Sequence, residues 1–297
     1  MNMQVEDIII IGAGPAGLAA AIQLKRYGIQ SLLFERAALG GLLRNANLVE
    51  NYPGFPRGVT GPGLVKLFAR QAYNMGVVLT HEDVTTITHD QELFQVSTGQ
   101  NSYCSRVAVI ATGTKPVRIA DQLIPEELQD RIFYEVYDLL REEGKCLVII
   151  GSGDVAFDYA LNLGKKNRVI ILNRGEESKC LPLLWERAQK IETISYKNSA
   201  VVQKVTKYSK SGMLVDCQTP AGELQFHADY LLVAIGREAN LDCLSDALMQ
   251  QTSMLEKQSL LYVIGDVKNG IFRQTAIAVG EGVLAAMRIY RYLKAIP

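Results

Sequence analysis

Two glycine-rich loops are the residues of this sequence that point most directly to chemistry. The first, Gly12-Ala13-Gly14-Pro15-Ala16-Gly17, follows the β-branched run 7–11 and precedes a helical pattern that closes at Gly28. Glycines in these places permit a tight turn, the approach of a pyrophosphate to the backbone, and close packing of helix on strand. The start of that helix then offers free N–H groups and a positive dipole end to phosphates.

Glu35 completes this first unit. It ends a second predicted strand, 31–34, and follows Gly12 by 23 residues, where a carboxylate can bind ribose hydroxyls. Strand, loop, helix, strand and acid together predict a dinucleotide site. Because an acid suits a ribose that carries no 2′-phosphate, we assign FAD to this unit.

The second loop is Gly151-Ser152-Gly153-Asp154-Val155-Ala156, with alanine in the helix-packing position. It follows an apolar run at 146–150 and opens a predicted helix, 154–163, which Gly164 stops. Another apolar run, 168–172, comes next. The order of elements therefore repeats that of the first unit and predicts a second dinucleotide site.

Arg174 occupies the position in the second unit that Glu35 has in the first. An arginine there accommodates a 2′-phosphate, so with Asn173 beside it the sequence favours NADPH. Lys179 and Arg187 add positive charge nearby. NADH, or no nicotinamide at all, stays open, since Arg174 and Lys179 are also typical of a solvated edge.

Small-residue turns mark where the chain is expected to change domain. Apolar runs lead into Ala111-Thr112-Gly113 and, in the same manner, into Ala234-Ile235-Gly236. Such turns let a chain pass close to a ligand. We therefore predict an α/β protein with two Rossmann-like three-layer domains: residues 1–116 and 235–297 bind FAD, and the inserted residues 117–234 bind NAD(P).

The last segment adds to the FAD site. A predicted strand, 260–264, leads into Gly265-Asp266, and Arg273-Gln274 precede a long helix from Thr275. The aspartate can accept hydrogen bonds from a ribityl chain. The start of the helix can stabilise negative charge on a reduced flavin.

Composition excludes several classes of function. Lys plus Arg and Asp plus Glu are both 31, so the net charge is zero and gives no case for nucleic acid or an anionic membrane. No apolar run is long enough to span a membrane, and the first residues lack the basic start of a secretory signal. We expect a soluble cytoplasmic protein.

The cysteines and histidines show no pattern of a redox or metal site. The five cysteines contain no CxxC, so we expect buried or half-buried thiols, and the three histidines lack the spacing of metal ligands, so we expect no metal site.

Together these residues resemble the low-molecular-weight thioredoxin reductases over nearly the whole chain. The shared motifs are the two loops, Ala111-Thr112-Gly113, Gly265-Asp266, Arg273-Gln274, and above all Gly40-Gly41, Glu50-Asn51-Tyr52-Pro53-Gly54-Phe55 and Thr60-Gly61-Pro62. The resemblance implies an FAD domain, an inserted NADPH domain, a homodimer, and domains that rotate to alternate flavin access. It also implies further FAD contacts from Arg36, Gly41, Leu42, Asn51 and Val84.

The sequence departs from that family at its dithiol. Where the family has Cys-x-x-Cys-Asp, this chain has Tyr134-Glu135-Val136-Tyr137-Asp138. A phenol forms no disulfide and is no substitute for a low-pKa thiolate, so dithiol exchange by the usual route is excluded. Tyr134 and Tyr137 are candidates to stack on the flavin or only to fill space. Asp138 is a candidate proton donor or a helix cap.

A second departure follows Arg174. The family commonly continues with another arginine, whereas this chain has Gly175-Glu176-Glu177. Two carboxylates do not favour a neighbouring 2′-phosphate, which weakens the case for NADPH.

The predicted function is an NAD(P)H-dependent FAD oxidoreductase whose acceptor is not a thiol. Candidate acceptors are oxygen, a quinone, another small molecule or an iron–sulfur protein. One alternative is a ferredoxin or flavodoxin-type NADP reductase, although a C-terminal extension over the flavin, usual in that type, is not expected in a chain ending at Pro297. A second alternative is a non-enzymatic flavin or nucleotide redox sensor. Disulfide chemistry through Cys180 lacks a partner thiol.

Overall fold

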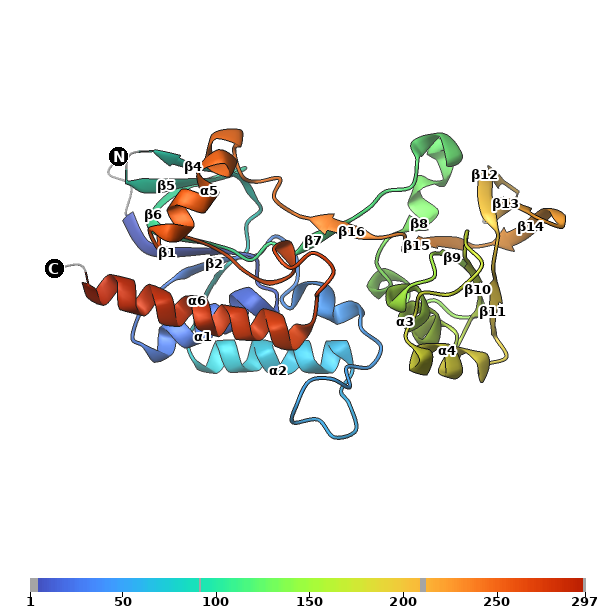
Figure 1. Cartoon of the computed structure of the whole chain (residues 1–297), viewed down its shortest axis with the longest axis horizontal. Helices are drawn as coiled ribbons and strands as arrows, with labels where there is room; N and C mark the ends of the chain where they lie inside the picture. The colour runs from blue at the N-terminus through green and yellow to red at the C-terminus, as the bar shows by residue number, and fades with distance from the viewer. Residues whose placement is uncertain (1–4, 91, 209–211, 296–297) are drawn as a thin grey trace. The chain divides into compact units, whose positions relative to one another are not determined.

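The computed structural model describes residues 5–90, 92–208 and 212–295, which fold into two compact units (Figure 1). Unit 1 consists of Met1–Arg44, Val49–Lys115 and Glu238–Pro297. Unit 2 consists of Pro116–Arg237 together with the short segment Asn45–Leu48. The predicted α/β fold class is confirmed, and each unit is considered separately below.

Unit 1 is built on one twisted sheet. Its strand order is β3-β2-β1-β6-β5-β4, and β17 also pairs with β6. The bounds are β1 (Val5–Ile11), β2 (Leu32–Phe34), β3 (Val78–Thr80), β4 (Val84–Asp90), β5 (Leu93–Thr98), β6 (Ser102–Ile110) and β17 (Leu261–Val263). The first half of β6 pairs antiparallel with β5, while Ala108–Ile110 pair parallel with β17. β6 therefore joins the antiparallel β4–β5 hairpin to the parallel part of the sheet.

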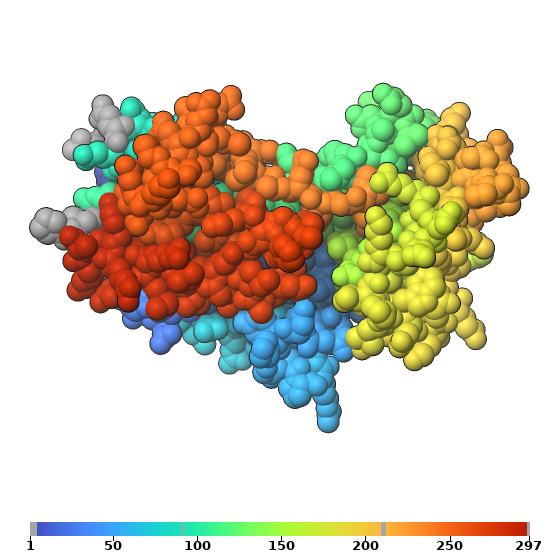
Figure 2. Space-filling model, viewed as in Figure 1, coloured from blue at the N-terminus to red at the C-terminus, as the bar shows by residue number. Residues whose placement is uncertain are grey.

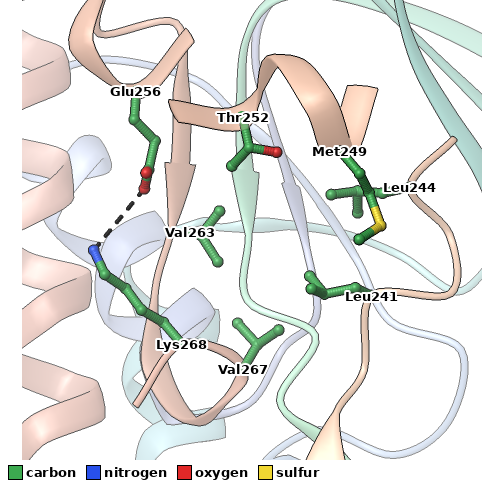
Figure 3. Close-up of a pocket in the computed structure, with 8 residues that line it drawn as sticks. All are labelled: Leu241, Leu244, Met249, Thr252, Glu256, Val263, Val267 and Lys268. Atoms are coloured by element: carbon green, nitrogen blue, oxygen red, sulfur yellow. Dashed lines mark ion pairs between the residues drawn. The ribbon is translucent and has the colours of Figure 1, made fainter. Parts of the chain in front are cut away.

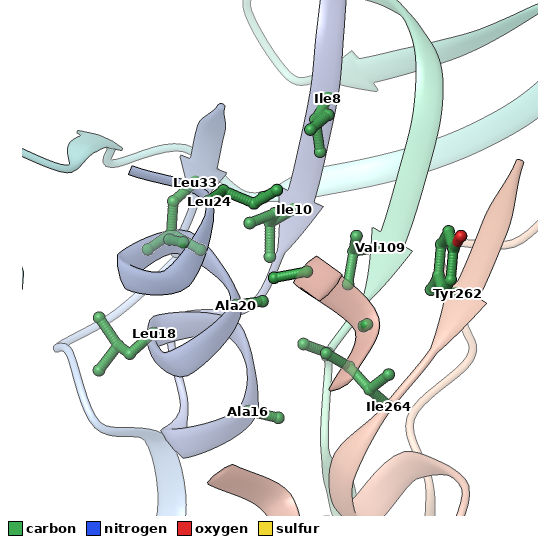
Figure 4. Close-up of a cluster of buried hydrophobic side chains, with 14 of the residues drawn as sticks. Ile8, Ile10, Ala16, Leu18, Ala20, Leu24, Leu33, Val109, Tyr262 and Ile264 are labelled. Carbon is green, nitrogen blue, oxygen red and sulfur yellow. The ribbon is translucent and has the colours of Figure 1, made fainter. Parts of the chain in front are cut away.

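Alternation along β1 divides the core of unit 1 between the two faces of the sheet. Ile8 and Ile10 face α1 (Pro15–Arg26), α2 (Gly61–Asn74) and α6 (Thr275–Ala295) (Figure 4). Ile9 and Ile11 face the other way, into a cluster with the β4–β5 hairpin and α5 (Asp246–Lys257). Successive side chains of a strand point to opposite faces, so a continuous apolar run supports a layer on each side.

Unit 2 is also a three-layer structure. Its sheet has the order β11-β10-β9-β15-β8 and is parallel throughout. α3 (Asp154–Leu163) and α4 (Pro182–Gln189) cover one face, and a three-stranded antiparallel sheet covers the other. The parallel strands are β8 (Ile132–Phe133), β9 (Cys146–Ile150), β10 (Arg168–Leu172), β11 (Ile194–Lys197) and β15 (Tyr230–Val233); the antiparallel ones are β12 (Val201–Lys207), β13 (Met213–Thr219) and β14 (Gly222–Ala228).

The remaining elements are short. β7 (Thr114–Pro116) and β16 (Arg237–Ala239) pair with each other, within or next to the stretches where the sequence predicts the chain to change domain. The 3₁₀ turns are η1 (Gly41–Asn45), η2 (Asp121–Leu123), η3 (Glu126–Arg131), η4 (Tyr137–Leu139) and η5 (Gly265–Val267). Over the described ranges, no helix has both the length and the apolar character needed to cross a membrane.

Close contact between α1 and α6 depends on small residues. A Cβ placed on Gly282 of α6 would lie 2.2 Å from the carbonyl oxygen of Ala16 and 3.0 Å from the Cβ of Ala19. A Cβ on Gly280, in the same helix, would meet nothing within 4 Å. In the space-filling view the red atoms of α6 form part of the surface of unit 1 that faces the viewer, with orange atoms above them (Figure 2).

We predict opposite effects from alanine at these two glycines. Gly282→Ala places a methyl group against backbone, which should destabilise unit 1 by about 1–3 kcal/mol. Gly280→Ala should stabilise it by up to about 1 kcal/mol, because alanine is the better helix former. Urea unfolding followed by circular dichroism measures both, and equal midpoints for the two variants would contradict this packing.

Candidate functional site

The first glycine loop has the geometry of a phosphate site. Gly12 has φ +103°, and a Cβ there would lie 2.4 Å from the carbonyl oxygen of Ala111. A Cβ on Gly17 would lie 1.9 Å from the carbonyl oxygen of Gly12. Gly14 differs from both, because a Cβ there would meet nothing within 4 Å. Two of the glycines are thus required by the fold, and the third leaves open space beside the backbone.

The start of α1 faces this open space without a cap. Gly14 is its N-cap residue, no side chain accepts a hydrogen bond from its first turn, and Pro15 stands at the first helical position. The first N–H groups of a helix need partners from outside the helix, and with the helix dipole they favour an anion. An uncapped start beside a glycine without close neighbours is what a pyrophosphate requires.

Glu35 is held against the same loop. Its Oε2 accepts a hydrogen bond of 2.9 Å from the N–H of Ala13, and its Oε1 accepts one of 2.9 Å from the N–H of Ala37. Gly40 also donates its N–H to the carbonyl of Ala13 at 2.9 Å. Carboxylate oxygens have more than one lone pair each, so Glu35 keeps capacity for ribose hydroxyls.

The predicted C-terminal contributors lie at the other side of α1. Gly265 has φ +77°, a Cβ there would lie 2.8 Å from that of Ala16, and its N–H donates to Glu281 at 2.6 Å. The side chains of Asn51 and Gln274 bond to each other at 2.7 Å. Glu281 was not predicted as a site residue, because a single acid within a helical pattern carries no signal that it caps a turn.

The other predicted FAD residues divide between surface and core. Thr112 donates its hydroxyl to the carbonyl of Asn240 at 2.5 Å. Arg36 is exposed, Leu42 is half-buried in η1, and Val84 is buried in the cluster beneath the sheet. Gly41 lies beside Gly14, since a Cβ on Gly41 would be 3.4 Å from the Cα of Gly14. Asp266 lies within η5, Thr275 begins α6, and Arg273 stands just before α6.

The second loop repeats the first at the same structural positions. Gly151 has φ +139°, and a Cβ there would lie 2.3 Å from the carbonyl oxygen of Ala234. Gly153 is the uncapped N-cap residue of α3, and a Cβ there would meet nothing within 4 Å. Ala156 is fully buried where the first unit has Gly17. Unit 2 therefore also presents open, uncapped N–H groups.

A loop from Asn173 to Leu181 bends back onto this second turn. The N–H of Lys179 and the hydroxyl of Ser178 both donate to the carbonyl of Ser152, at 3.0 and 3.2 Å. The N–H of Leu181 donates to the Asp154 carboxylate at 2.8 Å. The fold thereby brings Lys179 next to the glycine turn, which the spacing of the sequence does not reveal.

Asn173 holds the beginning of that loop from inside. Its buried amide donates to the carbonyl of Glu177 and to the hydroxyl of Tyr196, both at 2.8 Å, and accepts from the N–H of Gly175 at 2.9 Å. Arg174 is exposed, and so are Glu176 and Glu177. Asn173 therefore shapes the turn that carries Arg174. Val155 and Ile235 are exposed apolar residues of the same unit, and Gly236 has φ +135°.

The tyrosines at the dithiol position differ in their surroundings. Tyr134 is half-buried and packs against the core of unit 2, with the Arg118 guanidinium 5.2 Å from its ring centroid and the Ile119 N–H 3.4 Å from its hydroxyl. Tyr137 begins η4 and is 44% exposed. Asp138 is exposed in the same turn, whose N-cap residue is Val136, so Asp138 does not cap it. Tyr137 is thus the ring of this segment with the larger accessible surface.

The cysteines lie apart from one another. Cys104, Cys217 and Cys243 are buried, and Cys146 and Cys180 are half-buried, as expected. Burial raises the pKa of the Cys217 and Cys243 thiols to about 11, which keeps them protonated and unreactive at neutral pH. The Cys180 sulfur accepts a hydrogen bond of 3.1 Å from the hydroxyl of Ser178.

A shallow apolar hollow of unit 1 lies outside the predicted site residues (Figure 3). Its lining comes from α5, β17 and the residues next to them: Leu241, Leu244, Met249, Thr252, Glu256, Val263, Val267 and Lys268. Lys268 and Glu256 form an ion pair of 3.9 Å at its edge. None of the predicted cofactor residues lines this hollow.

Comparison with known proteins places the chain in a family. A family model for pyridine nucleotide-disulphide oxidoreductases matches residues 6–282. The chain therefore belongs to the pyridine nucleotide-disulphide oxidoreductase family. Within that family it is similar to thioredoxin reductases, which confirms the resemblance derived from its motifs.

Three relatives show the extent of the similarity. Thioredoxin reductase of Bacillus subtilis is 29% identical, over 98% of this chain and 96% of the relative. NADPH-dependent thioredoxin reductase 3 of Arabidopsis thaliana is 30% identical, over 97% of this chain and 58% of the relative. The crystal structure of Lactococcus lactis thioredoxin reductase has a TM-score of 0.86 at 25% identity, and the match covers 98% of this chain and 100% of that one.

The carboxyl of Asp158, on α3 in unit 2, has a pKa close to the physiological range. Its carboxylate accepts a hydrogen bond of 2.8 Å from the N–H of Asn47. Burial raises its pKa from 3.8 to about 6, against the opposing effects of that hydrogen bond and of the Lys165 charge. A carboxyl whose pKa is higher in the folded chain binds more protons when folded, so its effect on stability becomes less favourable as pH rises from about 4 to 6.

We predict that Asp158→Asn flattens the pH dependence of the stability of unit 2. A shift of about two pKa units corresponds to roughly 3 kcal/mol between pH 4 and pH 7, and asparagine does not ionise. Urea unfolding followed by the fluorescence of Trp185, the single tryptophan of the chain, reports on unit 2. Asp130→Asn, at an exposed position of the same unit, is the control and should keep the wild-type slope. An unchanged slope for Asp158→Asn would contradict the assignment.

Proposed function

We propose that this protein is an FAD-dependent oxidoreductase that takes reducing equivalents from NAD(P)H and passes them to an acceptor other than a thiol. The family accounts for the general reaction class. The observation that carries the proposal is the pair of glycine turns, each open and uncapped, in a chain whose dithiol position holds Tyr134 and Tyr137.

The residues of unit 1 fit FAD. The uncapped start of α1 and the open space at Gly14 suit its pyrophosphate, and Glu35 suits its adenosine ribose. Bound FAD would supply two-electron chemistry towards a nicotinamide and onward transfer to the acceptor. The contribution of the chain is to bind, orient and shield that group.

Support for a nicotinamide cofactor comes from unit 2. Gly153 repeats the open space at Gly14, and Arg174 and Lys179 supply positive charge on the loop that folds onto the turn. We propose NADPH as the preferred donor, with NADH as the alternative. The side chains of Glu176 and Glu177 are exposed. Their backbone carbonyls stabilise the loop, because they accept hydrogen bonds from the side chains of Asn198 and Asn173, respectively.

The acceptor differs from that of a thioredoxin reductase for a chemical reason. Thiol–disulfide exchange requires a thiolate that attacks and a second sulfur that resolves the mixed disulfide. Tyr134 and Tyr137 supply neither, and the five cysteines form no pair in the described structure. We therefore propose a small oxidant such as a quinone, or a one-electron redox protein, as the acceptor.

The homodimer implied by the resemblance stays a proposal. Unit 1 exposes large apolar side chains on α6 and on the loop before it, namely Ile271, Phe272, Ile277, Leu284 and Met287. Exposed apolar groups gathered in this way are typical of interaction surfaces. A second copy of the chain is the partner we propose for them.

Anaerobic mixing with each nucleotide tests the central proposal. We expect NADPH to bleach the flavin absorbance near the visible maximum, and NADH to do so more slowly, because only NADPH carries a 2′-phosphate for Arg174. An acceptor series of oxygen, a quinone and a ferredoxin then follows reoxidation. A flavin that stays oxidised with both nucleotides contradicts the proposal and favours the redox sensor.

We predict that alanine at the two open glycines separates the two sites. Gly14 and Gly153 have extended backbone angles that alanine adopts and no neighbours within 4 Å, so both variants should fold normally. The Gly14→Ala methyl group should obstruct a pyrophosphate and lower FAD affinity at least about tenfold. Gly153→Ala should retain FAD and raise the KM for NADPH at least about tenfold.

Flavin content after dialysis and steady-state kinetics measure these effects, and each variant is the control for the other. A Gly14→Ala protein that retains its full complement of FAD would contradict the assignment of FAD to unit 1.

A further inference from the structure

Glu135, which lies between Tyr134 and Tyr137 in the sequence, accepts hydrogen bonds from several side chains. Glu135 accepts from Arg237 at 2.6 Å, from Asn45 at 2.7 Å and from Tyr159 at 3.1 Å. The side chains of Glu135 and Arg237 are only 21% and 14% exposed. All four residues belong to unit 2. This is a different cluster from the two nucleotide turns.

The charge and the hydrogen-bond donors around Glu135 fix the position of its carboxylate. Arg237 stays cationic at any relevant pH. Burial and the Glu135 charge raise the pKa of Tyr159, so its hydroxyl stays protonated and donates. Charge-assisted hydrogen bonds are stronger than neutral ones, and removing one partner of a largely buried pair leaves the other charge uncompensated. The three donors therefore hold the Glu135 carboxylate at one position.

Asn45 extends this restraint to the backbone beside Tyr137. It is 3% exposed, and both polar atoms of its side-chain amide form hydrogen bonds. Nδ2 donates to Glu135, and Oδ1 accepts from the N–H of Tyr137 at 3.0 Å. Two residues further on, the N–H of Asn47 donates to Asp158. The segment 45–48 thus links Glu135, the turn that begins at Tyr137, and α3 within unit 2.

We propose that Glu135 is a positioning residue that fixes the turn carrying Tyr137 and Asp138, so that this turn keeps one conformation throughout the reaction. The proposal rests on the proposed function for the identity of that reaction. A dithiol has to change its covalent state in every cycle, whereas Tyr137 and Asp138 form no covalent bond with the acceptor and can be held still. A static aromatic and acidic surface suits an acceptor that docks against the protein without bonding to it.

Two consequences follow for the enzyme. The turn should show the same protection from solvent in the oxidised and the reduced protein. Loss of Glu135 should affect the half-reaction with the acceptor and leave the half-reaction with NADPH unchanged, because the Glu135 side chain bonds to Asn45, Tyr159 and Arg237, which lie outside the second glycine turn and its loop.

Amide hydrogen exchange of the full-length, FAD-loaded protein tests the restraint directly. In Glu135→Ala we expect peptides covering 45–48 and 134–139 to exchange at least tenfold faster than in wild type. Glu135→Gln keeps an acceptor of the same shape for Asn45 and Tyr159 and should restore most of the protection. Glu127→Ala removes an exposed carboxylate 3.8 Å from Lys207 in the same unit and is the matched control, with no change expected in either peptide.

Stopped-flow kinetics test the function of the restraint. In Glu135→Ala, flavin reduction by NADPH should stay within twofold of wild type, whereas reoxidation by a water-soluble quinone should slow about tenfold and recover in Glu135→Gln. Equal loss in both half-reactions would overturn the positioning role, and so would exchange in Glu135→Ala within twofold of wild type. If wild-type protein is not reduced by either nucleotide, the proposed function fails, while the exchange experiment still decides for or against the restraint.

Discussion

The structure depends on a single close approach that occurs once in each unit. The glycine that follows β1 in unit 1, and the one that follows β9 in unit 2, pass so near to the end of a neighbouring strand that a Cβ would lie 2.4 Å from the carbonyl oxygen of Ala111 and 2.3 Å from that of Ala234, respectively. No side chain fits at that distance. Both glycines therefore adopt a positive φ, and the chain turns directly into the helix whose free N–H groups form the phosphate site.

The two units differ in the contacts of the helix that follows the glycine turn. In unit 1 this helix is α1. Its residue Gly17 contacts the carbonyl of Gly12 in the turn, and its residue Ala16 contacts Gly282 of α6. In unit 2 a buried alanine, Ala156, is accommodated at the position of Gly17. α6 packs on α1 in unit 1, whereas unit 2 covers the corresponding sheet face with α3 and α4.

The segment at the position of the family's dithiol is organised by hydrogen bonds to one acid. Between Tyr134 and Tyr137 stands an acid, and the structure supplies that acid with a guanidinium, an amide and a phenol. Tyr134 packs, half-buried, against the core, while Tyr137 is exposed. The segment is thus organised around a fixed carboxylate, which is consistent with a reaction in which no sulfur takes part.

Local patterns in the sequence were enough for the α/β fold class, and two of the predicted strands, 146–150 and 168–172, have the predicted bounds. Buried parallel strands and glycine turns carry local signals of this kind, because each residue type is required by its own backbone. The antiparallel sheet β12–β14 and the helices α2, α4 and α5 were not predicted, since their half-exposed patterns are less distinct.

What the sequence determined by itself was the chemistry available: two phosphate turns, Glu35 and Arg174 as their distinguishing residues, and the absence of a CxxC. Tertiary structure alone decided which side chains meet. Asn45 reaches Glu135 across 90 residues, and Arg237 reaches it across 102. The bend that sets Lys179 on Ser152 likewise depends on Asn173, buried beneath the loop. Such contacts depend on how distant strands and helices pack, and no spacing along the chain records that packing.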